Sequence, residues 1–228
     1  MSTNATYGIR KNGELISMYC HYDGYLKGLG LDLIATIKSY GVEQIGFLFD
    51  NIIMVNKSSL PTKEQIDYCV KQGWMDLTTG GGVKTDWYCL IHKTQGKLDL
   101  LIQQLRRKDL ECNEVYGLSY KPFSFYYNYI IDLDANEFQF YKYDTLVATF
   151  PLDRIYDFSF EDIIDCLEKQ RDTNKTVVEI LPLFEATAKE HLEKEKALAK
   201  ERVLLLIANG FEDFNKYQLE KDIIALLN

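Results

Sequence analysis

The spacing of apolar residues changes near residue 150, and this change limits the folds that the chain can adopt. Before that point, apolar and polar residues alternate in many segments, as in strands with one buried face. After Phe158 the apolar residues recur at helical spacing. The helical stretches cover 161–171, 183–208 and 214–227. We therefore expect an α+β fold, with a mainly antiparallel sheet from two β-hairpins and packed helices in residues 1–150, and a helical C-terminal region in residues 151–228.

Both hairpins are predicted from turn residues that separate alternating segments. Asn12-Gly13 lies between segments 6–10 and 15–21, and Asn-Gly is a strong hairpin signal because both residues accept positive φ. A longer pattern, rich in Tyr and Phe, runs over 123–150 with a turn at 134–136. The first hairpin is expected to open the protein, and the second to close its sheet-forming part.

The remaining patterns predict shorter elements. Gly41 is expected to end a helix whose apolar residues recur over 29–40. A capping box at Thr62 and Gln65 begins a helix that ends before Gly73. The other expected elements are one or two strands in 44–55, a strand at 86–92, a helix at 97–107 and a glycine-rich loop at 78–84.

The charge of the chain argues against a nucleic-acid partner. There are 26 basic and 34 acidic side chains, and the net charge of −8 repels a phosphate backbone. Residues 1–150 carry a net charge of −2 and residues 151–228 carry −6. The acidity therefore belongs mainly to the helical region.

Signals for export and for membrane insertion are missing from the pattern. The first residues lack the basic start and apolar stretch of a signal peptide, and no apolar run approaches the ~18 residues of a membrane span. The five cysteines are odd in number and scattered, which favours reduced, buried thiols over a disulfide framework. We expect a cytoplasmic protein.

No motif indicates a cofactor or a metal. The glycines at 80–82 lack the Gly-Lys pair of a phosphate-binding loop. The stretch 132–136 begins like a calcium loop, but Glu137 occupies the position that such loops reserve for glycine. Cys89 and His92 would point to opposite faces of a strand. We therefore expect no cofactor and no metal site.

The first candidate site lies at the end of the first hairpin. His21 and Asp23 alternate along the chain, so both side chains can emerge on one face, as a general acid and base or a ligand clamp would. Tyr19 and Tyr25 flank this possible pocket. A structural interpretation is also open, in which Asp23 caps the following turn and His21 hydrogen-bonds to it.

The second candidate site is a series of acidic residues. Asp157, Glu161, Asp165 and Glu168 are spaced by four, four and three positions, which places their carboxylates along one side of a helix. Such a stripe is usually just solvated, but it can also steer a protein toward a basic groove. This series is the expected partner-binding surface.

One motif resembles a known group of proteins. It comprises Met18-Tyr19-Cys20-His21-Tyr22-Asp23-Gly24-Tyr25, then Gly28-Leu29-Gly30 and Leu33, with Ser2-Thr3 before the first strand. These residues resemble a family of uncharacterised bacteriophage proteins that open with Ser-Thr-Arg and carry a Tyr-x-His-Trp-Asp-Gly-Tyr-Pro motif. This chain has Asn4, Tyr22 and Leu26 where the family has Arg, Trp and Pro. The resemblance implies a phage origin and implies no activity.

Together these observations favour a non-catalytic phage accessory protein that binds and inhibits a bacterial host protein. An acidic surface suits the nucleic-acid-binding channel of a defence nuclease, as an anti-CRISPR protein would use it. The alternative is a small hydrolase or nucleotide-acting enzyme with a pocket around His21 and Asp23. Direct binding of nucleic acid or membrane is not expected, and the pattern predicts no particular oligomeric state.

Overall fold

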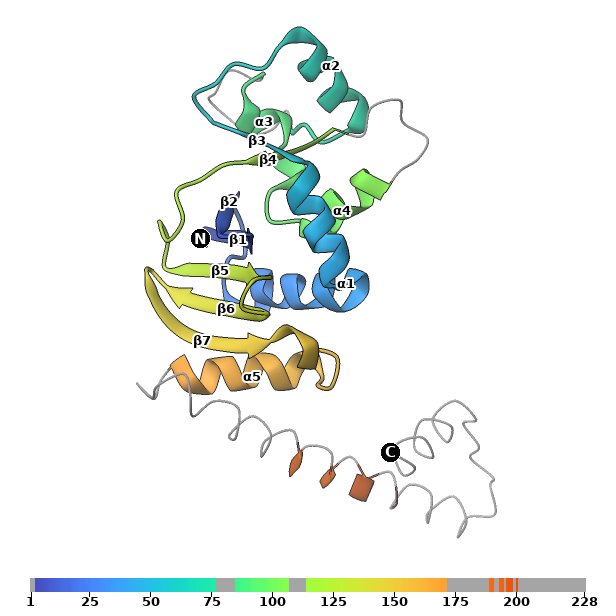
Figure 1. Ribbon diagram of the computed structural model, residues 1–228, viewed down its shortest axis with the longest axis vertical. Coiled ribbons are helices and arrows are strands. Elements are labelled where there is room, and N and C mark those ends of the chain that lie inside the picture. The colour runs from blue at the N-terminus through green and yellow to red at the C-terminus, as the bar shows by residue number, and fades with distance from the viewer. Residues whose placement is uncertain are drawn as a thin grey trace, which may run out of the picture. The chain divides into compact units, whose positions relative to one another are not determined.

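The structure, a computed structural model, describes residues 3–76, 85–106 and 114–171, together with 189, 190, 193, 194, 196–198 and 200 (Figure 1). The chain forms two compact units, Met1–Val178 and Glu179–Asn228. In the second unit the described residues are helical, and Lys194 Nζ lies 2.7 Å from Glu190 Oε1. The elements below belong to the first unit.

A five-stranded sheet is the largest feature of the first unit. Its strands are β1 (Ala5–Lys11), β2 (Glu14–Cys20), β5 (Tyr127–Asp132), β6 (Glu137–Lys142) and β7 (Thr145–Pro151), in the order β2-β1-β5-β6-β7. β1 pairs with β5 in parallel, and the other three neighbouring pairs are antiparallel. The predicted α+β class and both hairpins are confirmed. The sheet is mixed because the two hairpins meet through parallel strands.

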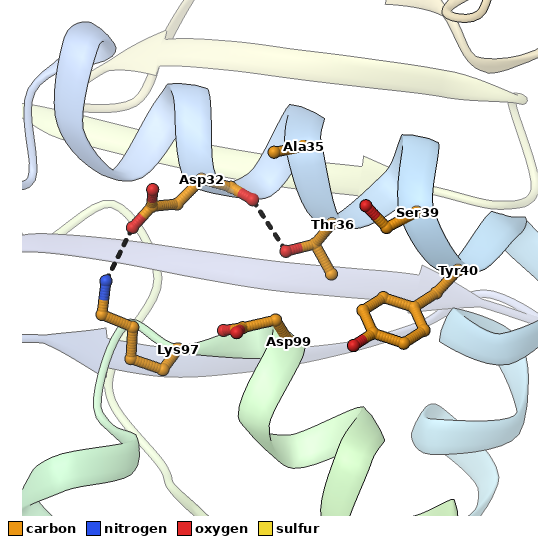
Figure 2. A pocket seen from close by; sticks show the side chains of 7 residues that line it. All are labelled: Asp32, Ala35, Thr36, Ser39, Tyr40, Lys97 and Asp99. Atoms are coloured by element: carbon orange, nitrogen blue, oxygen red, sulfur yellow. Dashed lines mark hydrogen bonds and ion pairs between the residues drawn. The ribbon is translucent and has the colours of Figure 1, made fainter.

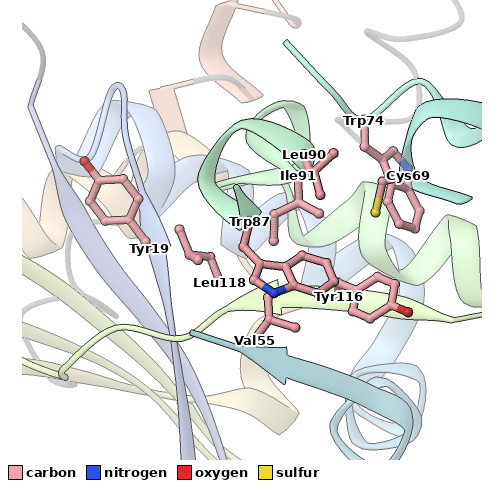
Figure 3. Close-up of a cluster of buried hydrophobic side chains, with 9 residues drawn as sticks. All are labelled: Tyr19, Val55, Cys69, Trp74, Trp87, Leu90, Ile91, Tyr116 and Leu118. Carbon is pink, nitrogen blue, oxygen red and sulfur yellow. The ribbon is translucent and has the colours of Figure 1, made fainter. Parts of the chain in front are cut away.

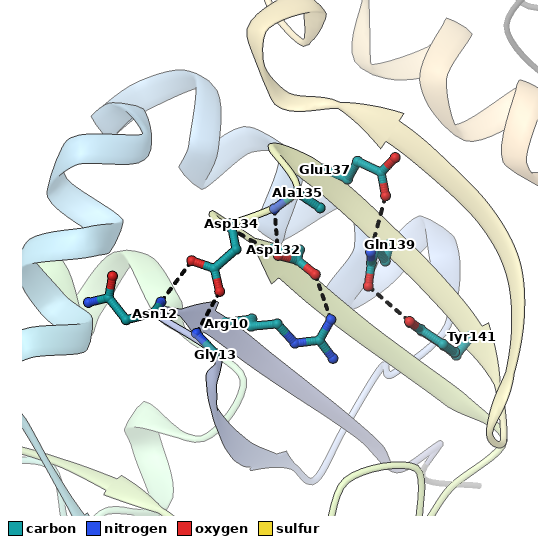
Figure 4. Close-up of polar contacts among 9 residues, drawn as sticks. All are labelled: Arg10, Asn12, Gly13, Asp132, Asp134, Ala135, Glu137, Gln139 and Tyr141. Carbon is teal, nitrogen blue, oxygen red and sulfur yellow. Dashed lines mark hydrogen bonds and ion pairs between the residues drawn. The ribbon is translucent and has the colours of Figure 1, made fainter.

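The turn of the first hairpin is held by the turn of the second. Asn12 and Gly13 have φ of 54° and 77°, the conformation expected of Asn-Gly. Their backbone N–H groups donate to the carboxylate of Asp134 at 2.7 and 2.8 Å (Figure 4). The stretch 132–136, which begins like a calcium loop, is therefore a hairpin turn whose Asp134 accepts hydrogen bonds from the turn of the first hairpin.

One face of the sheet carries the main apolar core. Tyr7, Tyr129 and Phe140 are in register across β1, β5 and β6, and all three are buried. η1 (Leu26–Gly30) leads into α1 (Leu31–Asn51), and Gly30 at their junction lies against the Tyr129 ring of this face. The later part of α1 turns away toward β3 (Figure 1). The Tyr129 hydroxyl donates to the carbonyl of Gly24 at 3.0 Å, so the core side chain also fixes the turn after β2.

The opposite face of the sheet is polar. Arg10 donates to the buried carboxylate of Asp132 at 2.6 Å, across the parallel pair (Figure 4). Tyr141 donates to Gln139, which in turn donates to Glu137. The alternation in the sequence therefore separates an apolar face from a polar one.

α1 continues further than the sequence predicts. Gly41 breaks the helical backbone, with φ of 79° and ψ of 164°, but helical residues resume and continue to Asn51. The expected strand over 44–55 is therefore wrong for its first part, and only Ile52–Val55 forms a strand, β3. Ile45 and Leu48 are both buried, and their separation by three positions is a helical spacing inside a segment of strand-like composition.

A second, two-stranded sheet pairs β3 in parallel with β4 (Val115–Leu118). α2 (Lys63–Gln72) begins with the predicted capping box, in which Thr62 and Gln65 each accept from the backbone of the other. The predicted helix over 97–107 is confirmed as α4 (Leu98–Arg106).

The predicted strand over 86–92 is wrong. The segment forms α3 (Trp87–Leu90) and η2 (His92–Thr94). Asp86 explains the difference, because its Oδ1 accepts from Cys89 N at 2.8 Å and caps a helical turn. The aromatic and aliphatic residues of the segment 86–92 pack into a second apolar cluster.

This second apolar cluster lies beside the two-stranded sheet (Figure 3). Trp87 and Tyr116 pack with ring centroids 4.9 Å apart, and Trp74 and Leu118 are buried in the same cluster. Tyr19 of β2 also belongs to it. The strand that leads to His21 is therefore anchored in both cores.

η3 (Leu152–Arg154) and α5 (Phe160–Arg171) follow β7. The helix predicted over 161–171 is confirmed, and it contacts β7 and η1. The expected domain boundary at residue 150 stays a prediction. The loop expected at 78–84 and the helix expected over 214–227 lie outside the described residues. The helix expected over 183–208 also lies outside them, except for the helical residues given above.

The described cysteines agree with the sequence. Cys20, Cys69 and Cys89 are buried thiols, as predicted, and none of them forms a disulfide with a described residue; Cys112 lies outside the described residues. Within the described ranges, no helix combines the length and the apolar character that crossing a membrane requires.

Candidate functional site

β2 ends in a hydrogen-bonded tyrosine and histidine. Tyr19 Oη lies 2.9 Å from His21 Nδ1. Burial, with smaller effects from Tyr88 and Tyr120, raises the pKa of Tyr19 to about 12, so its hydroxyl is protonated at neutral pH. We infer that this hydroxyl donates to His21 Nδ1, which leaves the imidazole proton of His21 on Nε2.

Asp23 and Tyr25 shape the turn after β2 through their backbones. Asp23 is in the left-handed region, with φ of 52°, and its carbonyl accepts from Leu29 N at 2.7 Å. The Tyr25 carbonyl accepts from Gly28 N at 3.0 Å, and the Tyr25 side chain is exposed. Although both residues are described, no hydrogen bond joins Asp23 to His21. The structure thus brings Tyr19 and His21 of the possible pocket together, and uses Asp23 and Tyr25 at the turn.

A second imidazole lies next to His21. The ring centroid of His92, the first residue of η2, is 5.7 Å from that of His21. Tyr22 lies 4.1 Å from the His21 centroid, and Tyr88 lies 5.3 Å from the His92 centroid. Asp76 Oδ2 is 3.6 Å from His92 Nδ1. We call these five residues, His21, Tyr22, Asp76, Tyr88 and His92, the histidine cluster.

Local backbone structure brings the distant members of the histidine cluster together. Asp76 N donates to the carbonyl of Cys89 at 3.2 Å, and Lys93 N donates to the carbonyl of Trp74 at 3.0 Å. The segment 74–76 therefore lies against α3 and η2.

Sequence reasoning misses Asp76, Tyr88 and His92 because it expects a strand over 86–92. A helical turn changes the geometry, since Tyr88 and His92 are four positions apart and so share one side of it. A capping Asp86 followed by this spacing is the signal that identifies Tyr88 and His92. Asp76 carries no comparable local signal.

More aromatic rings and one lysine surround the histidine cluster. Tyr120 stacks on Tyr19 with centroids 5.1 Å apart, and Phe125 stacks on Tyr120 at 5.3 Å. Lys57 Nζ lies 5.3 Å from the centroid of the Tyr88 ring, a cation–π contact. Because Tyr22 is 54% exposed, the cluster reaches the surface of the protein.

Both imidazoles of the cluster favour their neutral form. Burial lowers the pKa of His21, and the neighbouring His92 lowers it further. Burial also lowers the pKa of His92, while the Asp76 carboxylate opposes this effect. A neutral imidazole has one donor and one acceptor nitrogen, so the cluster can offer hydrogen bonds of both kinds.

The lowered pKa values predict that acid destabilises the fold. The unfolded histidines bind protons near pH ~6.5, and the folded ones only at lower pH, so this stability is present above that value and is lost as the pH falls below it. The free energy of unfolding, from urea titrations at several pH values above 5, should decrease toward pH 5. The double variant His21→Gln, His92→Gln should show a flatter dependence. An unchanged slope in the double variant would assign the effect to other groups.

The acidic series lies at the start of α5 and along it. Asp157 precedes the helix and pairs with Arg154, with 3.3 Å between Oδ2 and Nε. Glu168 pairs with Lys27 at 3.0 Å. Glu161 and Asp165 are exposed, and neither forms an ion pair or hydrogen bond with another described residue. Glu161, Asp165 and Glu168 therefore lie on α5 while Asp157 precedes it, and Glu161 and Asp165 are open to solvent.

A separate cavity of about 250 Å³ lies between α1 and the start of α4 (Figure 2). Its lining is polar and comprises Asp32, Ala35, Thr36, Ser39, Tyr40, Lys97 and Asp99. Lys97 Nζ lies 2.7 Å from Asp32 Oδ2, and the Thr36 hydroxyl donates to the Asp32 carbonyl. The lysine of this cavity is therefore already engaged, and no residue of either candidate site lines it.

In the ranges that the structure describes, His, Cys, Asp and Glu side chains form no group of three or more that could hold a metal ion. No protein-family model, curated protein or solved structure matches the chain.

Proposed function

We propose that this protein is a non-catalytic accessory protein that binds a bacterial host protein and inhibits it. The proposed contact surface is the exposed acidic side of α5. The observation that carries the proposal is the exposure of Glu161 and Asp165, which have no ion-pair partner among the described residues, in a chain of net charge −8. The resemblance of the N-terminal motif to bacteriophage proteins supports the bacterial setting.

The residues around this surface suit a partner with a basic groove. Exposed carboxylates attract a basic surface through solvent and raise the rate of encounter. Arg154 and Lys27 hold the two outer carboxylates in exposed ion pairs, which are weak and can be exchanged for an Arg or Lys of the partner. Tyr156, adjacent to Asp157, is exposed and offers an aromatic anchor. A nuclease that binds nucleic acid has a groove of the required charge.

Charge reversal on α5 is expected to slow association. The double variant Glu161→Lys, Asp165→Lys should reduce the on-rate at least about tenfold at low salt, because charges at the rim of an interface act mainly on encounter. The buried residues of α5 are unchanged, so folding should be retained. The wild type is used to capture its partner from a bacterial lysate, and the purified pair is then studied by surface plasmon resonance. Raising the ionic strength from ~0.01 M to ~0.15 M shortens the Debye length from ~30 Å to ~8 Å and should weaken wild-type binding.

A matched control variant distinguishes the effect of the α5 surface from the effect of the net charge. Glu14 and Asp144 are exposed at the hairpin turns, and Glu14→Lys, Asp144→Lys changes the net charge by the same amount. The proposal expects this control to bind and inhibit like the wild type. Equal slowing by both double variants, or an affinity that does not depend on salt, would contradict a contact through α5.

A second candidate function, a small hydrolase or nucleotide-acting enzyme, is favoured by the histidine cluster. A carboxylate beside one nitrogen of an imidazole is the arrangement that orients a general base, and Asp76 and His92 have it. In this hypothesis Asp76 is the carboxylate beside the catalytic histidine, the role that the sequence suggested for Asp23. An inhibitor should retain its activity in the variant His92→Leu, whereas an enzyme of this kind should lose turnover.

A further inference from the structure

His92 carries a buried hydrogen-bonding atom that has no partner in the described part of the chain. The His92 side chain is only 8% exposed, and its Nε2 atom is buried without a hydrogen bond to any residue that the structure describes. The other ring nitrogen, Nδ1, faces the Asp76 carboxylate. Because a carboxylate is only an acceptor, the ring proton belongs on Nδ1, and Nε2 presents a lone pair. A buried acceptor of this kind is costly unless a donor reaches it.

His21 presents the complementary group. Its Nδ1 accepts from Tyr19, so its Nε2 carries a proton and can donate. The two imidazole centroids are 5.7 Å apart. A hydrogen-bond acceptor and a donor therefore lie on neighbouring rings of the histidine cluster.

Aromatic rings and a lysine limit what that ligand can be. Tyr88 lies beside both imidazoles, and Lys57 adds a positive charge over the Tyr88 ring. Tyr22 lies edge-on to both imidazoles, 4.1 and 6.2 Å away by ring centroids. The Tyr22 side chain is more than half exposed and forms no hydrogen bond with a described residue, so it can turn outward without breaking one. The space it leaves would be bounded by flat rings.

We propose that the histidine cluster binds the base of a nucleotide. A nucleobase places a donor beside an acceptor on one edge, which matches His21 Nε2–H and the His92 Nε2 lone pair. Its flat face stacks on the ring of Tyr88, which lies beside both imidazoles. The phosphate lies toward Lys57. This inference rests on the second candidate function and involves no residue of α5, so it and the inhibitor proposal can fail separately.

Isothermal titration calorimetry of the full chain tests this site with adenosine, AMP and ribose 5-phosphate. Adenosine and AMP should bind, AMP more tightly, and ribose 5-phosphate should bind at least about tenfold more weakly than AMP. The variant His92→Leu should weaken adenosine binding about fivefold to tenfold, the loss expected for one hydrogen bond. His92→Gln should weaken it less, because the amide oxygen can still accept.

Substitution of Lys57 distinguishes recognition of the phosphate from recognition of the base. Lys57→Ala should weaken AMP and leave adenosine unchanged, whereas the control Lys121→Ala, at another exposed lysine, should change neither. Melting temperatures of all variants show whether each one is folded. Nitrogen NMR of the imidazoles provides a measurement without substitution, because the chain has only 3 histidines. Adenosine should shift the signals of His21 and His92 together.

Three results would overturn the proposal. Absence of heat and of imidazole shifts with both adenosine and AMP would show that His92 Nε2 is satisfied by water alone. Equal binding of AMP and ribose 5-phosphate would indicate a phosphate site without base recognition. Unchanged adenosine affinity in a folded His92→Leu variant would place the base elsewhere. None of these results changes the expectation for Glu161 and Asp165.

Discussion

Replacing Phe138 by alanine is expected to destabilise the protein by about 4 kcal/mol, the usual cost of removing a large aromatic side chain from a core. Phe138 is fully buried in the middle strand of the β5–β6–β7 segment, and its register partners are Ile131 and Phe150. Its ring also stacks on Tyr129, with centroids 6.0 Å apart. The two neighbouring strands hold the backbone in place, so the cavity cannot collapse fully. Chemical denaturation at equilibrium measures the loss.

An exposed aromatic residue provides the control. Phe47 lies on α1 and is 50% exposed, so Phe47→Ala removes the same atoms from a half-exposed position and should cost only about 1 kcal/mol. Similar losses for the two variants would mean that the apolar face of the sheet is not the main core.

Replacing Gly24 by alanine is expected to cost about 3 kcal/mol through overpacking. A methyl group at Gly24 would lie 2.5 Å from Ala5 Cβ and 2.8 Å from the Thr3 carbonyl oxygen. Neither neighbour can yield easily, because Ala5 is buried in β1 and the Thr3 carbonyl accepts from Gly24 N at 2.8 Å. For a chain of this size the melting temperature should fall by about 10 °C, which differential scanning calorimetry can detect.

Gly46 is the matched position for this substitution. Gly46 lies within α1, and an added methyl group would meet its nearest neighbour, Leu133 Cδ1, at an ordinary 3.6 Å. Gly46→Ala should therefore be neutral or should stabilise the helix by up to about 1 kcal/mol. If Gly24→Ala were as well tolerated as Gly46→Ala, the glycine of the His-Tyr-Asp-Gly-Tyr motif would have no packing role.

Local signals explain the parts of the fold that the sequence predicts. Asn12-Gly13 needs no distant residue to favour its turn, and the Thr62–Gln65 capping box is complete within one helical turn. The wrong strand assignments have a common cause. Gln44–Asn51 and 86–92 are rich in β-branched or aromatic residues, yet helical spacing and an aspartate cap determine their backbone.

The candidate sites also contain some residues that a local pattern predicts and others that it does not. The placement of Glu161, Asp165 and Glu168 on one helix could be predicted because their spacing is helical, although Asp157 precedes that helix. The pairing of Tyr19 with His21 joins residues two positions apart. His92 and Asp76 reach His21 only through tertiary structure. No pattern within a short segment contains that information, so the more complete chemistry of the histidine cluster depends on the fold.

The parallel pairing of β1 with β5 has a consequence for how the protein is made. Thr6 and Asn128, which are hydrogen-bonded across this pair, are 122 residues apart in the sequence. During translation the first hairpin emerges from the ribosome early. One edge of β1 then remains unpaired until β5 has been synthesised. At about 5 to 20 residues per second, that wait is on the order of 10 seconds. An unpaired strand edge can pair with other chains, so β1 of the nascent chain is exposed to aggregation and to capture by chaperones until β5 has been made.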